Sequence, residues 1–458
     1  MKIKLIWLLS FLLYWPALFN YFSHDDFFNL NLARTNSLAG FLKFLDPVHA
    51  PAGFGSYRPL TTQVYFFVSR LFNFSPLPLH LIAFIFFFAD IFLVYKLGQL
   101  LLKKEKPALV ATFLYAVSAT HFAQLYWPSI FQELGLIFFF LLSVWLYFKN
   151  RPWLSLLAFI GALMSKETAV MLPFVLGIFI FTEKRWHRFL TLLPFGAVLA
   201  VYLYFHFASY GLPAGNEYKW DFSLKVINTL FWYLLWSFNL PEMLVDFIGP
   251  GLHLNLDLLR YYGREIAPIL LFFLITIGSL LLAVLKKPKI DWRILLLGSA
   301  WFFLTLAPVI FLPWHKFTYE LGVPLIGLAL LLGWLMTKIS SKTIFIFCFA
   351  WLATSLFTLR LTAKTHWVTT GAKVAQRVQA YFLSSESSIN QPKIVFYDTA
   401  PDASLPYSPA NELKIDLSNN DFFTVYYPGK FKVSYLPELP KNPEPDTLYI
   451  RARKFLGY

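Results

Sequence analysis

The sequence contains little charge and a single cysteine. Charged residues make up 14% of the 458 residues, whereas a soluble globular domain carries about 25%. Cys348 lies within an apolar run, so one chain can form neither a disulfide framework nor a thiolate metal site. No Walker-type loop and no Rossmann glycine pattern is present, which argues against a soluble nucleotide as ligand. These absences exclude an ordinary soluble domain and a disulfide-stapled one.

Apolar residues are abundant instead. Hydrophobic residues account for 58% of the chain and aromatic residues for 20%, and several apolar runs reach the roughly 20 residues that span a bilayer. The net charge is +14, and the basic residues fall in short clusters between these runs, such as Lys103-Lys104-Lys106 and Lys286-Lys287-Lys289. A basic cluster at every second connection is the positive-inside pattern. The basic charge therefore orients the chain among membrane lipids, and we expect no nucleic-acid partner.

The hydropathy pattern predicts an all-α polytopic membrane protein with about eleven transmembrane helices. We expect the first apolar run to be a retained anchor with its start in the cytoplasm, because Leu18–Phe22 offers no small-residue cleavage site. An odd number of spans then places the C-terminus outside. The expected spans cover residues 3–22, 77–102, 107–122, 128–148, 152–164, 168–181, 189–207, 266–285, 294–311, 321–336 and 344–361.

The chain changes character at about residue 362. Residues 1–362 form the predicted transmembrane domain, with a catalytic outer loop at 23–58 and a second outer loop at 208–264. Residues 26–45 alternate apolar and polar side chains and could form a helix in the membrane interface. Residues 363–458 are expected to form a small β-rich extracytoplasmic domain. Its predicted strands cover 393–397, 422–426 and 447–450.

Asp25 and Asp26 directly follow the first apolar run and are the most informative residues of the chain. Because charged groups are costly near hydrocarbon, a carboxylate pair at the membrane surface points to chemistry there. The alternative interpretation is a solvated helix terminus that simply ends the span.

The polar residues that stand out from the apolar background, Asp25 and Asp26 among them, lie largely on the outer side of the predicted topology. Carboxylates mixed with Arg, Lys and His suit an anionic headgroup, particularly a phosphate. The phosphate would belong to a lipid, since the surroundings are apolar and aromatic. The residues are His24, Asp25, Asp26, Arg58, His80, His121, Glu133, Lys166, Glu167, His315, Lys316 and Glu320.

A lipid-linked sugar phosphate needs a base for the incoming hydroxyl, cations for the departing phosphate and an apolar groove for the lipid. Asp25 or Asp26 could be the base, and Arg58 and Lys166 could balance the charge of the leaving group. A divalent cation held by Asp26 or Glu167 could help, but this acidic set does not dictate a metal.

Each of these residues also has a purely structural explanation. Arg58 could anchor a helix start at the interface. The Lys166-Glu167 pair could be an ordinary hairpin turn, although a turn between such short spans sits deep, which favours function. His80 and His121, taken alone, fit packing histidines better than catalytic ones.

Several motifs occur in an order that is known from one group of membrane enzymes. They are the acidic pair Asp25-Asp26, Tyr57-Arg58-Pro59-Leu60, His80, the set His121, Trp127, Ser129 and Glu133, the turn Ser165-Lys166-Glu167 with Pro173, and His315-Lys316-Phe317-Thr318-Tyr319. With these motifs the chain resembles the GT-C superfamily of membrane glycosyltransferases, and in particular its protein O-mannosyltransferase-like branch. The resemblance covers residues 1–180 well and the entrance to the tenth expected span weakly. It departs from the family at Ala123 and Phe131, where an acidic residue and an arginine are usual.

The resemblance implies an inverting sugar transfer from a polyprenyl-phosphate-linked donor to a hydroxyl acceptor on a protein, a lipid or an envelope glycan. The reaction would take place at the outer face of the cytoplasmic membrane. Asp25 looks like the catalytic base, with Asp26 as its catalytic neighbour. The implied donor-phosphate ligands are Arg58, Lys166, His315 and Lys316, and the supporting residues are Glu167, His80, His121 and Glu133. We expect Lys166→Ala to weaken donor use far more than it changes folding.

Two other functions fit the same residues. A lipid-linked glycan ligase or polymerase would use a similar frame on larger donors, so the distinguishing test is whether a monosaccharide donor suffices. A lipid or sugar-lipid transporter would favour polar residues at the bilayer midplane and a repeated half. This chain concentrates its polar residues on one face and shows no evident repeat.

Overall fold

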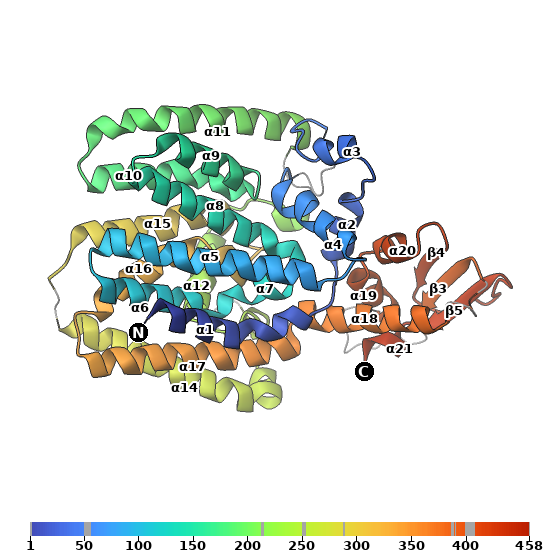
Figure 1. The fold of residues 1–458 in the computed structure, drawn as a ribbon. Helices are drawn as coiled ribbons and strands as arrows, with labels where there is room; N and C mark the ends of the chain where they lie inside the picture. The colour runs from blue at the N-terminus through green and yellow to red at the C-terminus, as the bar shows by residue number, and fades with distance from the viewer. Residues whose placement is uncertain are drawn as a thin grey trace.

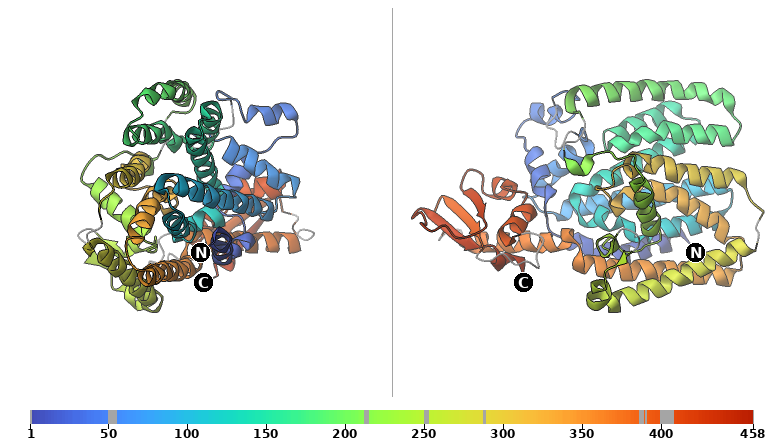
Figure 2. Two further views of the ribbon diagram at one scale, coloured as in Figure 1. Left: turned by 60° about the vertical axis from the view of Figure 1, so that its left-hand side comes forward. Right: turned by 180° about the vertical axis from the view of Figure 1, so that it is seen from behind.

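The computed structural model describes residues 2–49, 56–211, 215–249, 253–286, 289–385, 389, 391–398 and 408–457. Parts of both predicted outer loops, and Lys287 of one basic cluster, lie outside the described residues. The described chain is mostly helical. A bundle of long helices with roughly aligned axes carries a smaller C-terminal unit at one end, as Figures 1 and 2 show.

The bundle contains the apolar helices that the hydropathy pattern predicts. They are α1 (Ile3–Tyr14), α5 (Leu77–Leu102), α6 (Glu105–Ala116), α7 (Phe122–Tyr126), α8 (Phe131–Phe148), α9 (Pro152–Leu163), α10 (Leu172–Thr182), α11 (Leu193–Phe205), α14 (Asp257–Leu285), α15 (Trp292–Ile310), α16 (Pro324–Met336) and α17 (Ser341–Thr365). Proline in the first turn sets the start of several of them, for example α9 and α16, because its missing N–H is not needed there.

Six helical segments of the described chain are long and apolar enough to cross a membrane. The count becomes seven if Glu105–Ala116 and Ala119–Tyr126, which meet at a bend of 45°, form one broken span. The remaining four expected spans are shorter apolar helices, at Ile3–Phe19, Pro152–Leu163, Glu167–Thr182 and Pro324–Met336. About eleven spans therefore stays a prediction.

Close helix packing fixes the middle of the bundle. Gly298 of α15 faces Gly327 of α16, and a Cβ atom added to Gly298 would lie 2.8 Å from the Gly327 carbonyl oxygen. Small residues at such a crossing let two backbones approach, as in other membrane helix pairs. The indole of Trp301 donates to the carbonyl of Val323 at 3.0 Å and ties the same two helices together.

The 23–58 loop contains two short helices rather than one, α2 (Asp25–Leu32) and α3 (Leu38–Lys43). Ser37 begins the second, since its side-chain oxygen accepts the N–H of Gly40. After Arg58 the chain enters the bundle through a π-helical turn at Leu60–Val64 and then α4 (Tyr65–Leu71). In the 208–264 loop, the apolar stretch belongs to α12 (Lys225–Ser237), followed by α13 (Leu244–Phe247) and the β1–β2 ladder (Ile248–Gly249, His253–Leu254).

The C-terminal unit is a small α/β layer structure. Helix α18 (Trp367–Ser385) leads out of the bundle, and the sheet has the order β4-β3-β5 with both pairings parallel. The elements are β3 (Lys393–Tyr397), α19 (Pro409–Asp416), α20 (Asp421–Tyr426), β4 (Lys432–Leu436), β5 (Thr447–Arg451) and α21 (Arg453–Leu456).

This unit corrects one part of the sequence-based prediction. The expected strands at 393–397 and 447–450 are present, but residues 422–426 form helix α20, and the strand β4 was not predicted. A short aromatic run has no periodicity that separates a strand from a buried helix. In the structure, Phe422 packs against Phe27 of the bundle at 5.2 Å while Phe423 packs against Phe382 at 5.2 Å. Tertiary packing on two sides selects the helix, so the unit is not β-rich.

Candidate active site

A cavity of about 450 Å³ opens at the end of the bundle that carries α2 and the C-terminal unit. It is lined by side chains from α2, the 56–62 segment, the turns that precede α8, α10 and α16, the 208–264 loop and the start of α18. Six of the polar residues singled out from the sequence line it: Asp25, Arg58, Lys166, Glu167, His315 and Glu320.

Asp25 and Asp26 open helix α2 but face different surroundings. Asp26 is fully buried; its Oδ2 accepts the Ser23 N–H at 2.9 Å, and its Oδ1 accepts the N–H and hydroxyl of Ser129 at 2.8 and 2.6 Å. Asp25 lines the cavity, and within the described part of the chain its carboxylate accepts no hydrogen bond. Asp26 therefore anchors α2 to the start of α8, whereas Asp25 is left free to act on a bound molecule.

Burial raises the pKa of both carboxyl groups. The pKa of Asp25 rises to about 6, because the cavity wall removes water from around it. The pKa of Asp26 rises to about 8, although its three hydrogen bonds oppose this change. At neutral pH Asp25 is thus mostly ionised yet basic enough to accept a proton, which suits a general base.

The residue before the pair is held by the C-terminal unit. His24 has φ of +52°, a left-handed conformation that a non-glycine residue rarely adopts. Its backbone N–H donates to the Asp416 carbonyl at 2.9 Å, and its Nε2 lies 3.2 Å from Asp416 Oδ1. Burial lowers the pKa of His24 to about 3 and raises that of Asp416 to about 8, so this is a contact between two uncharged side chains.

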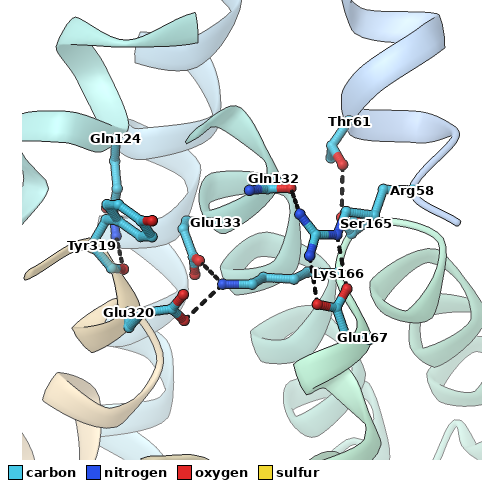
Figure 3. A network of polar contacts seen from close by, with 10 residues as sticks. All are labelled: Arg58, Thr61, Gln124, Gln132, Glu133, Ser165, Lys166, Glu167, Tyr319 and Glu320. Atoms are coloured by element: carbon cyan, nitrogen blue, oxygen red, sulfur yellow. Dashed lines mark hydrogen bonds and ion pairs between the residues drawn. The ribbon is translucent and has the colours of Figure 1, made fainter. Parts of the chain in front are cut away.

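Figure 3 shows a charged network, four members of which line the cavity: Arg58, Lys166, Glu167 and Glu320. The Lys166 ammonium is 3% exposed and donates to Glu133 and, at 2.7 Å, to Glu320. Arg58 donates two hydrogen bonds to Glu167, at 2.8 and 2.5 Å. The predicted turn at residues 165–167 is thus part of a network that joins the entrances of four helical segments.

The cations of this network keep unused donors. An ammonium has three N–H donors and a guanidinium five; Lys166 uses two of them, and Arg58 uses three, with its third going to Gln132. With all five groups ionised, two cations face three carboxylates, giving a net charge of −1. Attraction for an anionic ligand therefore depends on directed N–H groups rather than on net charge.

Four other predicted residues do not line the cavity. Glu133 lies behind Lys166, and the Lys316 ammonium donates to the Pro313 carbonyl at 2.6 Å. Both ring nitrogens of His80 lie 3.0 Å from backbone carbonyl oxygens. Those of His121 lie 2.7 Å from Gln124 Oε1 and 2.8 Å from the Tyr115 carbonyl oxygen. Both rings are buried, and all four of their nitrogens face oxygens of the protein.

Aromatic side chains complete the walls of the cavity. Trp127 and Trp367 meet edge to face at 4.6 Å beside Asp25, and Tyr218 from the 208–264 loop packs against His315 at 4.5 Å. Burial lowers the pKa of His315, so this ring acts as a neutral hydrogen-bonding group rather than as a cation. Because aromatic residues make up 20% of the chain, abundance alone could not single these out.

The residues suggested as metal ligands do not fit that role. Both oxygens of Asp26 and both oxygens of Glu167 already accept hydrogen bonds from protein donors. The described ranges contain no group of three or more His, Cys, Asp or Glu side chains that could hold a metal ion.

Comparisons with known proteins give a distant likeness in shape. No protein-family model and no curated protein sequence matches the chain. The crystal structure of the Archaeoglobus fulgidus oligosaccharyltransferase in complex with Zn and sulfate is 13% identical, with a TM-score of 0.46 over 91% of this chain and 61% of that one. The same enzyme tethered to an acceptor peptide containing the NVT sequon is 12% identical, with a TM-score of 0.44 over 96% and 63%. The chain thus spans less than two thirds of the length of these neighbours.

Proposed function

We propose that the protein is an inverting glycosyltransferase of the GT-C type, with Asp25 as its general base. It transfers a sugar from a polyprenyl-phosphate-linked donor to a hydroxyl acceptor at the outer face of the cytoplasmic membrane. The observation that carries the proposal is the free Asp25 carboxylate, which shares one cavity with unused N–H donors of Lys166 and Arg58.

In the proposed step, Asp25 takes the proton of the acceptor hydroxyl. The acceptor oxygen forms its bond to the anomeric carbon while the bond from that carbon to the phosphate oxygen breaks. The phosphate leaves with the electron pair. A single displacement needs one base rather than the nucleophile and acid pair of a retaining enzyme, which agrees with Asp26 being occupied by Ser23 and Ser129.

The other parts of the cavity supply binding. In this proposal the free N–H groups of Lys166 and Arg58, which line the same cavity, bind the oxygens of the leaving phosphate. Trp127, Trp367 and Tyr218 provide the apolar faces that a pocket uses to hold a ring, with few polar groups to orient it. The polar groups gather at one end of the bundle rather than at its middle, which favours an enzyme over a transporter.

The test uses the purified protein in lipid nanodiscs with radiolabelled polyprenyl-phosphate monosaccharides and a membrane extract as acceptor source. We expect the wild type to transfer or slowly hydrolyse one donor. Asp25→Asn should be about 10²- to 10⁴-fold slower, the usual cost of losing a general base, while still binding the donor. Asp257→Asn, which changes an exposed carboxylate at the start of α14, is the matched control and should keep full activity.

Three results would overturn the proposal. Near-normal turnover by Asp25→Asn removes this residue from the role of base. Turnover only with large lipid-linked glycans identifies a ligase or polymerase. Donor binding by the wild type with no turnover of any donor identifies a transporter.

A further inference from the structure

A second cavity, of about 210 Å³, lies at the opposite end of the bundle from the candidate active site. Its walls come from the ends of α5, α8 and α10 and the start of α15. The length of helix α8 gives the separation of the two cavities. The helix begins beside Glu133 and ends at Phe148, and its 18 residues span about 27 Å. That separation is close to the roughly 30 Å thickness of a bilayer's hydrocarbon core. The second cavity thus lies at the level of the lipid headgroups of one leaflet.

The lining of this cavity is strongly cationic on one side. Four basic side chains face a single carboxylate, that of Glu183, which forms an ion pair with Arg293. Arg188 donates to the Asn150 side chain and lies over the ring of Tyr147 at 5.7 Å. The four basic residues are Lys103, Arg185, Arg188 and Arg293. The lining carries a net charge of +3.

Two of these cations have no partner of their own. Among the described residues, the Lys103 ammonium and the Arg185 guanidinium make no ion pair or hydrogen bond. Lys103 ends α5 in the left-handed conformation, at φ of +53°, so the helix stops at the rim of the cavity. Two unpaired cations at the rim of one cavity are suited to a single anion that accepts hydrogen bonds from both.

The rest of the lining is apolar. Leu100, Leu101 and Phe179 form the wall toward the middle of the bundle. Next to the cavity, Trp186 is 57% exposed and stacks on Phe189, an arrangement typical of aromatic residues at a membrane interface. A phospholipid matches this lining, because its anionic phosphate lies next to apolar acyl chains.

We propose that this cavity binds the phosphate-bearing headgroup of an anionic phospholipid, with Lys103 and Arg185 as its principal ligands. Basic pockets between membrane helices recognise such headgroups. A lipid whose headgroup carries its own cation is disfavoured, because that cation would lie among Arg188, Arg293 and Arg185. The proposal is independent of the chemistry assigned to the first cavity.

The test is native mass spectrometry of the detergent-purified full chain with added dioleoyl phosphatidylglycerol or dioleoyl phosphatidylcholine. We expect the wild type to retain one phosphatidylglycerol in preference to phosphatidylcholine. Lys103→Gln with Arg185→Gln should weaken this retention about 30-fold, since each cation near a membrane surface contributes about a factor of five. The matched control is Lys286→Gln with Lys289→Gln, which removes two exposed charges at the same end of the bundle without touching the cavity.

Each other outcome overturns the assignment. Equal loss of retention in both double variants shows a non-specific effect of surface charge. Displacement of phosphatidylglycerol by millimolar inorganic phosphate, with phosphate alone raising the melting temperature, shows a site for free phosphate. An unchanged lipid preference in Lys103→Gln with Arg185→Gln removes these residues as ligands. The melting temperature of each variant, followed by tryptophan fluorescence, verifies that it is folded.

Discussion

Replacing the buried Lys166 by methionine tests the charged network directly. The substitution keeps a flexible apolar side chain of similar length and removes the ammonium on which Glu133 and Glu320 converge. These residues are 1% and 8% exposed, so water replaces the lost partner poorly, above all at Glu133. Breaking a buried ion pair costs about 3–5 kcal/mol, because a charge is left uncompensated. Since two carboxylates lose their partner here, we expect a loss near the upper end, about 5 kcal/mol of unfolding free energy.

The measurement is thermal unfolding in one detergent, followed by tryptophan fluorescence. Lys364→Met is the control, because its pairing with Glu265 involves a lysine side chain that is 68% exposed and such pairs contribute under about 1 kcal/mol. Adding Glu133→Gln and Glu320→Gln to Lys166→Met should recover most of the stability, since a neutral replacement of a whole buried network is often tolerated.

The refuting result is a Lys166→Met protein that melts at the temperature of the Lys364→Met control. Because Lys166 is buried, its removal should also affect folding, so the expectation that donor use falls far more than folding changes stays a prediction. A donor-binding defect in this variant is therefore meaningful only beside the stability measurement.

Three further predictions concern activity and packing. The wild-type kcat/KM should rise with pH to a plateau, with its midpoint near pH 6, because Asp25 must be ionised to act as base and burial raises its pKa to about 6; a profile that is flat from pH 5 to 8 contradicts this. Gly371→Ala places a Cβ atom 2.4 Å from the His24 ring and should lower kcat about tenfold or more with a smaller change in KM, as steady-state kinetics would show. Gly298→Val forces α15 away from Gly327 and should cost about 1–3 kcal/mol; an unchanged melting temperature would contradict it.

The positions of the bundle helices could be predicted because hydropathy is a local property of the sequence. The bend between α6 and α7 could not, since distant residues hold it. The Ser118 hydroxyl donates to Asn239 at 2.8 Å, and the Tyr14 hydroxyl donates to the Ser118 carbonyl. These partners lie 121 and 104 residues away along the chain. The hydropathy pattern of one apolar segment does not indicate either contact.

The sequence singled out part of the lining of this cavity, but not the contacts among the residues that it singled out. Asp25 and Asp26 are neighbours of the same type, and nothing local distinguishes them. Ser129, 103 residues further on, donates two hydrogen bonds to the Asp26 carboxylate. Of this pair, only the Asp25 carboxylate therefore remains free in the cavity. Likewise, the position of Lys166 between Glu133 and Glu320 depends on three helix entrances meeting at one end of the bundle. Packing between segments that lie far apart in the sequence thus decides which of the singled-out side chains remain free.

Two contacts with helix α2 make the C-terminal unit part of the candidate site rather than a separate cap. Asp416 holds the strained backbone at His24, and Asp421 accepts a hydrogen bond from Asn31 at 2.5 Å, so residues of α19 and α20 fix both ends of α2. Deleting the unit would release the helix that carries Asp25. Loss of activity in such a truncation would then report a displaced base and not a lost acceptor site. Only substitutions on surfaces of the unit that do not contact α2 can separate acceptor binding from the positioning of Asp25.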